Sequence, residues 1–347
     1  LEKRNHIAGN CYSEKDGATG IEYHKYGTHI FHANDETVWK YVNQFSSFNS
    51  YRHNLLTKYK NKIYPLPINL GTINSYFNKN FNPDQAKKFI EKLTKPYKNQ
   101  KGYNFENKAM SQIGKELYQA FIKNYTTKQW GKSPKQLPST IFNRLPLRFS
   151  YNQNYQKTCR WQGIPVNGYT GLISNILDNK KIKVKLDTNF SLPNQKYNVK
   201  YFTIYTGPLD KFFNYKHGKL EWRSLRFEKK VCNTSDYQGN SVINYPELKY
   251  KFTRIHEPKH LHLERNYFNL NKTLIIKEFP AQNNKEPYYP VNDIKNKKIQ
   301  QMYTESAGQL KKFLFGGRLA NYAYYDMDMT ILAALNMYKK IKRLTNN

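Results

Sequence analysis

A chain of 347 residues is long enough to bury a large core and to form two or three domains or lobes. It carries 57 Lys and Arg residues against 25 Asp and Glu, a formal net charge of +32, which would suit an anionic partner such as nucleic acid, a membrane surface or a phosphorylated small molecule. The lysines are dispersed and form no dense basic arm, so compositional drift explains the charge better than a dedicated polyanion surface.

The cysteine content and the hydropathy exclude further classes. Cys11, Cys159 and Cys232 form no C-x-x-C pair, so neither a disulfide framework nor a thiolate zinc site is supported. No stretch approaches the roughly 18 continuous apolar residues of a membrane span, and no signal peptide is visible. We therefore expect a cytoplasmic protein without a membrane span.

The N-terminal region is typical of an α/β unit. Its first ten residues, LEKRNHIAGN, place an acidic residue after an apolar one, as a dinucleotide-binding unit does after its second strand. A glycine-punctuated, β-rich stretch follows over 11–34. Asn34 or Asp35 could then cap a helix over 37–45, where apolar residues recur at helical spacing.

A strand pair and a helical region come next. The segments 55–60 and 62–68 predict two strands joined by a turn. Apolar residues three and four apart predict helices over 82–93 and 106–125, and 133–146 is typical of a further short helix.

The second half returns to an α/β pattern. Thr170 could cap a helix over 171–179, and the segments 181–187 and 201–207 read as strands. Alternating strands dominate 216–280. The tail is predicted as helix 299–310, strand 311–317, loop 318–326 and helix 329–344. An α/β fold is thus interrupted twice, once by helices and once by an antiparallel sheet.

Seven strings stand in one order along the chain: HKYGTHIFH (24–32), LPINL (66–70), YTTKQWG (125–131), RLPLRF (144–149), NYPELKYKFTRI (244–255), EPYYPVND (286–293) and GGRLANYAYYDMD (316–328). Together they closely resemble the UDP-galactopyranose mutase family, and the likeness extends from residue 1 to the last helix. The resemblance implies an α/β fold in which a discontinuous, Rossmann-like FAD-binding domain carries an inserted helical bundle and an antiparallel sheet domain.

The resemblance also implies domain boundaries. The domains would be the FAD-binding domain (1–48, 162–208 and 296–347), the helical bundle with a mobile substrate loop (74–161), and the antiparallel, substrate-binding sheet (49–73 and 209–295). In the family about 30 residues precede the string LEKRNHIAGN and hold the glycine loop, so we expect this chain to lack that phosphate-binding part. The family more often shows two glycines where this chain has Ala8 and Gly9.

The family interconverts UDP-galactopyranose and UDP-galactofuranose, which supplies galactofuranose for cell-surface glycans. The resemblance implies an isomerase (an intramolecular transferase) that needs reduced FAD. In the family reaction the flavin N5 attacks the anomeric carbon and expels UDP, giving a sugar adduct whose ring opens and recloses on another hydroxyl. The cofactor carries the chemistry, and the protein supplies position and electrostatics. UDP-galactose is the implied partner, and a homo-oligomer is expected by resemblance.

Two arginines match the pair that flanks the pyrophosphate in the family. Arg144 lies on a Pro-bounded segment that closes over substrate there, and Arg254 follows the fifth string's aromatic residues. Guanidinium forks match phosphate oxygens and stay charged, which suits a diphosphate that must leave and return. Arg148 and Arg160 match no ligand position.

Five aromatic residues stand at substrate positions of the family. Tyr125 and Trp130 would stack on the base or enclose the sugar. Tyr155, Tyr288 and Tyr324 resemble tyrosines that bond the phosphates, with Tyr289 as the alternative to Tyr288. Outside these motifs a single one of the 30 tyrosines is more often part of the core or surface.

The flavin site is implied by three further segments. Glu2 would receive the ribose hydroxyls, with Lys3 and Arg4 beside it. His29 matches a histidine that lies against the isoalloxazine ring. Arg318 matches a residue that contacts FAD and tunes its potential. The remaining cofactor-binding positions implied are Gly9, Asn10, Gly27, Asp326 and Met327.

The last helix and the histidine trio each allow a second interpretation. Asp326 begins the last helix, whose free N–H groups would stabilise reduced flavin, and a plain N-cap is the simpler role. His24, His29 and His32 could suggest metal, but their spacing fits no standard zinc signature, so we predict no metal site.

Two other functions stay open at this point. A truncated, non-catalytic mutase homologue would bind a UDP-sugar without flavin. A basic nucleic-acid binder would show strongly salt-dependent binding to DNA, which no specific feature of the sequence leads us to expect.

Overall fold

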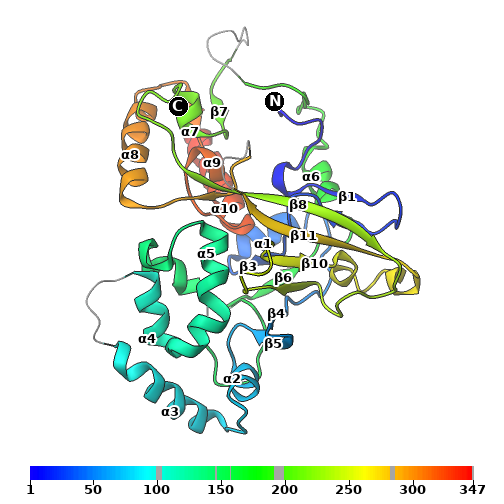
Figure 1. Cartoon of the computed structure of the whole chain (residues 1–347). Helices are drawn as coiled ribbons and strands as arrows, with labels where there is room; N and C mark the ends of the chain where they lie inside the picture. The colour runs from blue at the N-terminus through cyan, green and yellow to red at the C-terminus, as the bar shows by residue number, and fades with distance from the viewer. Residues whose placement is uncertain (99–103, 145–146, 157, 191–198, 282–285, 346–347) are drawn as a thin grey trace.

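The computed structural model describes residues 1–98, 104–144, 147–156, 158–190, 199–281 and 286–345. A long mixed sheet crosses the middle of the molecule in Figure 1, with one group of helices below it and smaller α/β elements above it. This mixture of helices and strands agrees with the predicted α/β class.

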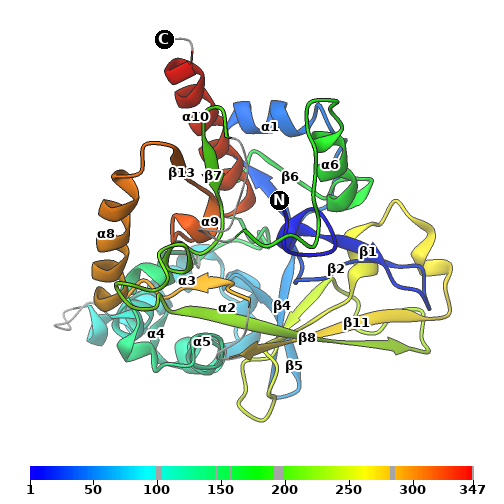
Figure 2. The same ribbon diagram turned by 90° about the horizontal axis from the view of Figure 1, so that it is seen from above.

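The central sheet has seven strands. Their order is β12 (Tyr289–Pro290), β8 (Trp222–Cys232), β11 (Thr273–Ala281), β10 (Arg254–His256), β9 (Val242–Asn244), β4 (Leu55–Tyr59) and β5 (Lys62–Leu66). Neighbouring strands are antiparallel except β9 and β4, which run parallel. Figure 2 shows β8 and β11 side by side, and all nine residues of β11 pair with β8. The strands predicted within 216–280 are thereby confirmed.

The predicted strand pair at 55–68 forms the hairpin β4–β5. Lys60 and Asn61 join its strands with φ values of 48° and 63°. Two consecutive residues of positive φ are typical of the hairpin turn whose twist matches the flanking strands. This turn fixes the register, with Tyr59 opposite Lys62.

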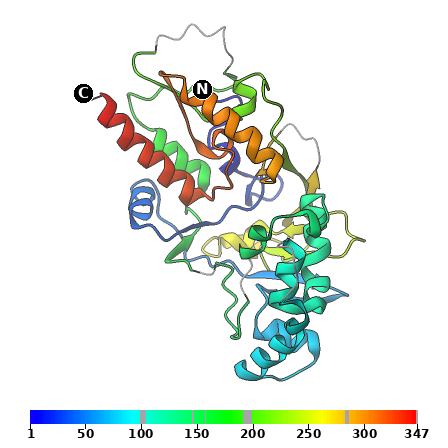
Figure 3. The same cartoon turned by 90° about the vertical axis from the view of Figure 1, so that its left-hand side faces the viewer.

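The helices below the sheet form a separate group, seen apart from α8 and α10 in Figure 3. They are α2 (Leu70–Phe77), α3 (Pro83–Thr94), α4 (Phe105–Leu117) and α5 (Asn124–Trp130), with a π-helical turn (Tyr118–Lys123) between the last two. α3 begins where its sequence predicts, because the Asn82 side chain accepts a hydrogen bond from Gln85 N and Pro83 occupies the first helical position.

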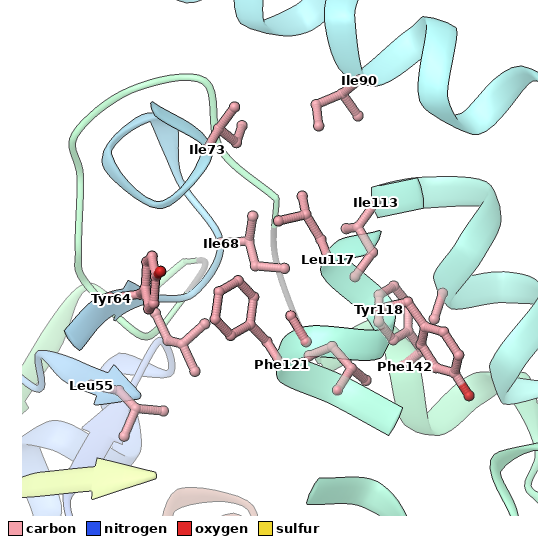
Figure 4. Close-up of a cluster of buried hydrophobic side chains, with 14 of the residues drawn as sticks. Leu55, Tyr64, Ile68, Ile73, Ile90, Ile113, Leu117, Tyr118, Phe121 and Phe142 are labelled. Carbon is pink, nitrogen blue, oxygen red and sulfur yellow. The ribbon is translucent and has the colours of Figure 1, made fainter. Parts of the chain in front are cut away.

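A buried apolar cluster joins this helical group to the sheet. Figure 4 shows Leu55 and Tyr64 of the hairpin beside Leu117 and Phe121 of the helices. Each of these side chains is at most 6% exposed. Because the cluster holds the start of α5 against the sheet, it fixes where the Tyr125–Trp130 turn of helix meets β10 and β8.

Smaller α/β elements lie on the other side of the sheet. The strands are β1 (Ser13–Lys15), β2 (Glu22–His24), β3 (Phe31–Ala33), β6 (Trp161–Gly163), β7 (Thr203–Tyr205) and β13 (Phe313–Phe315), and the helices are α1 (Glu36–Val42), α6 (Gly168–Leu177), α7 (Leu209–Phe212), α8 (Ile294–Gly308), α9 (Gly317–Ala320) and α10 (Met327–Thr345). β7 and β13 pair in parallel, and β1–β2 and β3–β6 are antiparallel. Asp35, one of the two predicted caps, starts α1 by accepting a hydrogen bond from Val38 N.

Three predictions in this region are wrong. The segment 181–187 forms no strand. Its apolar side chains are exposed to solvent, so no packing against another element stabilises an extended conformation. Within this segment, Lys185 O accepts a hydrogen bond from Glu2 N. Thr170 does not cap α6, because its hydroxyl donates to Ser13 O instead. Residues 317–320, partly predicted as loop, form the short helix α9.

Within the described ranges, no helix combines the length and the apolar character that crossing a membrane requires.

Candidate functional site

A cavity of about 2010 Å³ lies where the central sheet meets the smaller α/β elements. Pockets for a single small molecule usually measure about 300–1,000 Å³, so this cavity is larger than one small ligand requires. One end is lined by β7 and β13. The other end is lined by charged and aromatic side chains from α5, β8, β10, β11, the segment 286–291 and the start of α10.

Most of the residues predicted for the site line this cavity. They are Glu2, Lys3, Arg4, Gly9, Asn10, Gly27, His29, Trp130, Arg254, Tyr288, Tyr289, Tyr324, Arg318, Asp326 and Met327. Tyr125 and Tyr155 do not line it. Arg144 ends a short 3-10 segment, and its side chain lies outside the described part of the structure.

Arg254 is held on β10 by two partners. Its Nε lies 3.4 Å from Glu278 Oε1, and its Nη2 donates to the Tyr125 hydroxyl. Burial disfavours both charges, yet Arg254 holds the pKa of Glu278 below its usual value and Glu278 raises the pKa of Arg254. The guanidinium therefore stays charged at the cavity wall. Tyr125 does not line the cavity itself and contributes to the site by accepting this hydrogen bond from Arg254.

Tyr155 lies behind this wall. Its backbone N–H donates to His53 O, and its ring lies 5.5 Å from the His53 ring in an edge-on arrangement. It packs against the core cluster of the helical group. The structure thus places Tyr155 near the site but in contact with the protein interior.

Arg318 lies beside a stacked pair of tyrosine rings. Its Cζ is 4.8 Å from the ring centroid of Tyr324 and 5.3 Å from that of Tyr289, and the two rings stack 5.4 Å apart at 16°. Its Nε and Nη2 are buried and have no hydrogen-bond partner among the described residues. Buried N–H groups of a cation are costly without an acceptor, so this geometry fits an anionic or carbonyl-bearing ligand.

Tyr288 and Tyr289 both line the cavity, but they contact different residues. Tyr289, the alternative choice, stacks on Tyr324 and lies over Arg318, whereas Tyr288 is 7% exposed and faces Phe227 at 6.2 Å. Burial raises the pKa of both hydroxyls, so both remain neutral hydrogen-bonding groups.

The turn at 27–29 forms another part of the cavity wall. Gly27 has φ +99°, and a Cβ there would meet the Phe227 ring at 3.1 Å, so this position requires glycine. His29 Nδ1 lies 2.7 Å from Gly27 O, and burial lowers the pKa of His29 to about 4. The ring is therefore neutral at physiological pH and bonded through Nδ1–H.

The histidine trio has separate partners. His24 Nδ1 accepts a hydrogen bond from His29 N, and His32 Nε2 lies 3.8 Å from Asp326 Oδ2. Each ring is thus oriented by a neighbour of its own.

The N-terminal segment is tied to the segment after β11. Arg4 bonds Asn10 Oδ1 and Glu286 Oε2, both at 2.8 Å, and Lys3 bonds the other oxygen of Glu286. Glu2 Oε1 accepts from Arg4 N at 2.9 Å. These bonds position Glu2 and Asn10 on the cavity wall.

Asp326 immediately precedes α10. Its backbone oxygen accepts from both the N–H and the hydroxyl of Thr330. Asp326 and Met327 line the cavity at the start of this helix, where unpaired N–H groups favour negative charge.

The sequence analysis missed several charged residues of the wall, of which Glu278 and Arg223 are bonded to predicted parts of the site. Glu278 lies on β11 directly opposite Arg254. Arg223 lies on β8, and its Nε donates to Gln129 O at 3.1 Å, next to Trp130. No local signal marks either one, because each looks like an ordinary polar residue within a strand.

Arg148 and Arg160, which matched no ligand position, do not line the cavity. Arg148 donates to the carbonyls of Asn152, Asn154 and Gln156, and Arg160 lies on the Trp161 ring at 4.2 Å.

The fold and the site together define an α/β protein with a charged, aromatic ligand cavity. A model of UDP-galactopyranose mutase matches residues 120–324, and one of an NAD(P)-binding Rossmann-like domain matches residues 1–45. The chain belongs to the UDP-galactopyranose mutase family, a family of flavoproteins. The resemblance drawn from the seven strings, the α/β fold class and the assignment to an isomerase family are thereby confirmed.

Curated relatives match nearly the whole chain. A probable UDP-galactopyranose mutase of Klebsiella pneumoniae is 39% identical over 342 residues, covering 96% of this chain and 86% of that protein. A dTDP-fucopyranose mutase of Escherichia coli is 37% identical over 344 residues, with coverages of 96% and 89%. A UDP-galactopyranose mutase of Mycoplasma genitalium is 31% identical over 376 residues, with coverages of 99% and 88%.

A solved structure supports the fold. The crystal structure of a reduced UDP-galactopyranose mutase superposes with a TM-score of 0.68 at 13% sequence identity, covering 93% of this chain and 84% of that one.

Proposed function

We propose that this protein interconverts UDP-galactopyranose and UDP-galactofuranose with FAD in its reduced form. The observation that carries the proposal is a single cavity with two half-buried arginines, Arg254 and Arg318, on its walls, in a chain of this family. In this proposal the product supplies galactofuranose for cell-surface glycans. The three free cysteines fit a reducing compartment.

Arg318 and its neighbours would hold the flavin. The unpaired Nε and Nη2 of Arg318 offer two donors, and the start of α10 at Asp326 and Met327 offers a positive helix end. Glu2, Asn10 and Gly9 line the cavity where the nucleotide part of FAD would lie. When bound in reduced form, the flavin supplies a nucleophilic nitrogen for the anomeric carbon of the sugar.

Arg254 would hold the diphosphate of the substrate. A charged, half-buried guanidinium would stabilise the negative charge that grows on UDP as it leaves, and would keep UDP close enough to return. Glu278 fixes one edge of this guanidinium and Tyr125 binds another, so the donors are oriented before substrate binds. Arg144 is proposed as the second phosphate arginine.

Aromatic residues would enclose the sugar and the base. Trp130 lines the cavity near Arg223, which adds a cation to this wall. Tyr288 and Tyr324 would bond the phosphates, and Tyr155 would act from behind the wall. His29, neutral and bonded to Gly27 O, would lie against the flavin ring. The three-domain division of the chain is part of the same proposal.

The test begins with the flavin absorption spectrum of protein purified from its full coding region. A mutase assay with dithionite-reduced protein then follows product formation from UDP-galactofuranose by chromatography. The relative from E. coli acts on a dTDP-fucopyranose by name, so the same assay is run with that nucleotide sugar. We expect bound flavin and faster turnover of the UDP-sugar. Faster turnover of the dTDP-sugar, or well-folded protein without flavin, would contradict the proposal.

A further inference from the structure

A line of polar side chains runs from Arg254 to the turn at 27–29. Arg254 and His256 lie two residues apart on β10 and so share a face of the sheet, and Glu278 is paired directly opposite Arg254 on β11. Glu278 Oε1 lies 3.4 Å from Arg254 Nε, and Glu278 Oε2 lies 3.0 Å from His256 Nε2. His256 Nδ1 lies 2.8 Å from Thr28 Oγ1. One carboxylate thus joins the arginine to the turn.

The protonation of these groups fixes the direction of each hydrogen bond. Burial works against the charge of Glu278, but Arg254 and the bond from His256 keep its pKa below the usual value, so Glu278 only accepts. Burial lowers the pKa of His256 and keeps the ring neutral. His256 must therefore donate through Nε2–H to Glu278 and accept through Nδ1 from the Thr28 hydroxyl.

The line is protected from water and in close contact with the turn. His256 is 1% exposed and Glu278 is 2% exposed. A Cβ on Gly27 would lie 3.9 Å from Glu278 Oε2, so the turn sits directly on the carboxylate. Bonds in such a dry site are strong and polarise one another.

We infer that His256 is a positioning residue that couples Arg254 to the turn carrying Gly27 and His29, by way of Glu278 and Thr28. The inference rests on the proposed function in one respect, because it takes Arg254 as the group that binds the diphosphate. When a diphosphate binds Arg254, the ion pair between the guanidinium and Glu278 weakens. The hydrogen bond from His256 to Glu278 and the one from Thr28 to His256 then change in strength. Thermodynamic linkage makes the coupling reciprocal, so the state of the turn changes the affinity of Arg254 for the diphosphate.

Two variants separate the links of this line. Thr28→Val removes the hydroxyl with little change in shape and leaves the bond between His256 and Glu278 intact. His256→Gln can place its amide N–H at the position of Nε2 for Glu278, but it has no acceptor atom at the position of Nδ1 for Thr28. Thr57→Val is the matched control, because its buried hydroxyl donates to Asn244 O in the same sheet, away from Glu278.

The first measurement is the affinity for UDP, by calorimetry on each purified protein with the cofactor it retains. We expect Thr28→Val and His256→Gln to raise the Kd for UDP by roughly fivefold or more, the usual lower range of coupling between sites. Thr57→Val should leave the Kd within about twofold of the unmodified protein, since it breaks no link of the line. A purely structural role for His256 would lower stability without this selective change in Kd.

The second measurement is the imidazole spectrum of protein labelled with ¹⁵N-histidine. The His256 signal is identified by its absence in His256→Gln. We expect the Nε2–H tautomer, a shift of the Nδ1 signal when UDP is added, and loss of that shift in Thr28→Val. The Nδ1–H tautomer, or a Nδ1 signal that ignores both UDP and Thr28→Val, would overturn the inference.

The two proposals fail in different ways. Mutase activity with UDP affinity unchanged in Thr28→Val and His256→Gln would overturn the inference and leave the proposed function standing. Protein without flavin or activity, in which UDP still shifts the His256 signal and both variants weaken UDP binding, would overturn the proposed function and support the inference.

Discussion

The two walls of the cavity satisfy their buried charges differently. On the sheet wall, Arg254 is paired with Glu278, whose other oxygen is bonded by His256. At the other arginine, Arg318 lies beside the stacked rings of Tyr289 and Tyr324, and its buried Nε and Nη2 meet no acceptor among the described residues. On the sheet wall the charge of Arg254 is balanced by Glu278, although Nε of Arg254, like Nε and Nη2 of Arg318, has no hydrogen-bond partner among the described residues. Nε and Nη2 of Arg318 can donate to a ligand, and Arg318 has no carboxylate partner like Glu278 among the described residues, so we expect its charge to serve ligand binding.

The largest expected effect comes from breaking the ion pair between Arg254 and Glu278. Arg254→Met leaves Glu278 buried without its cation, and breaking a buried ion pair in this way should lower the free energy of unfolding by about 3–5 kcal/mol. Urea denaturation without added ligand measures it. Arg160→Met is the control, since this arginine lies on the surface against Trp161 and should change stability by less than about 1 kcal/mol. Similar losses in both variants would contradict the difference between the walls.

Lowering the pH should reduce the free energy of unfolding, because the folded protein keeps several buried histidines neutral. Burial lowers the pKa of His53 from 6.5 to about 3 and that of His24 well below 6.5. Because the folded-state pKa is lowered, the unfolded chain takes up protons that the folded protein does not, so stability is lost as the pH falls below about 6.5. For His53 the loss reaches roughly 2 kcal/mol at pH 5, at about 1.4 kcal/mol per pH unit.

The check is urea denaturation at pH 7.5 and pH 5. His53→Gln cannot titrate, so its stability should fall less between the two pH values than that of the unmodified protein. An equal fall in both proteins would show that His53 does not carry the effect.

Arg318→Met should act in the opposite sense to Arg254→Met. In protein stripped of flavin, an apolar side chain in place of an unpaired buried cation should leave stability unchanged or raise it. Flavin retention should fall roughly tenfold, because hydrogen bonds to charged groups are worth about 1.5–3 kcal/mol. Flavin fluorescence released on dialysis measures retention. A large loss of stability in the stripped protein would show that Arg318 has a structural partner.

The sequence predicts the pieces of both walls better than it predicts how they combine. An alternating pattern predicts β8, the run TLIIKEFP predicts β11, and the strings containing Arg254 and Arg318 do meet at one cavity. The pattern at 181–187 alternates too, but its apolar side chains find no partner to bury them and no strand forms. Alternation therefore predicts a strand only where a second surface covers it.

Glu278 shows why the site could not be completed from the sequence. It lies in an apolar run, where one carboxylate reads as an ordinary exposed position of a strand. Its importance comes from the register that sets it opposite Arg254 and diagonal to His256. No local pattern encodes that register. Arg223 is hidden in the same way, as one of 57 Lys and Arg residues.

The smallest expected effect concerns backbone strain in the N-terminal part of the cavity wall. Ala8 has φ 70° and ψ 0°, and Gly9 after it has φ 53°, just before the turn in which Asn10 and Cys11 line the cavity. A left-handed conformation costs a non-glycine residue about 1–2 kcal/mol, and glycine loses about 0.5–1 kcal/mol more backbone entropy on folding than alanine. Ala8→Gly should therefore raise the free energy of unfolding by about 0.5–1 kcal/mol. Ala18→Gly, in an exposed turn without positive φ, should lower it slightly. If both glycine variants destabilise the protein equally, the left-handed conformation at Ala8 costs nothing, and the strain assigned to this wall is absent.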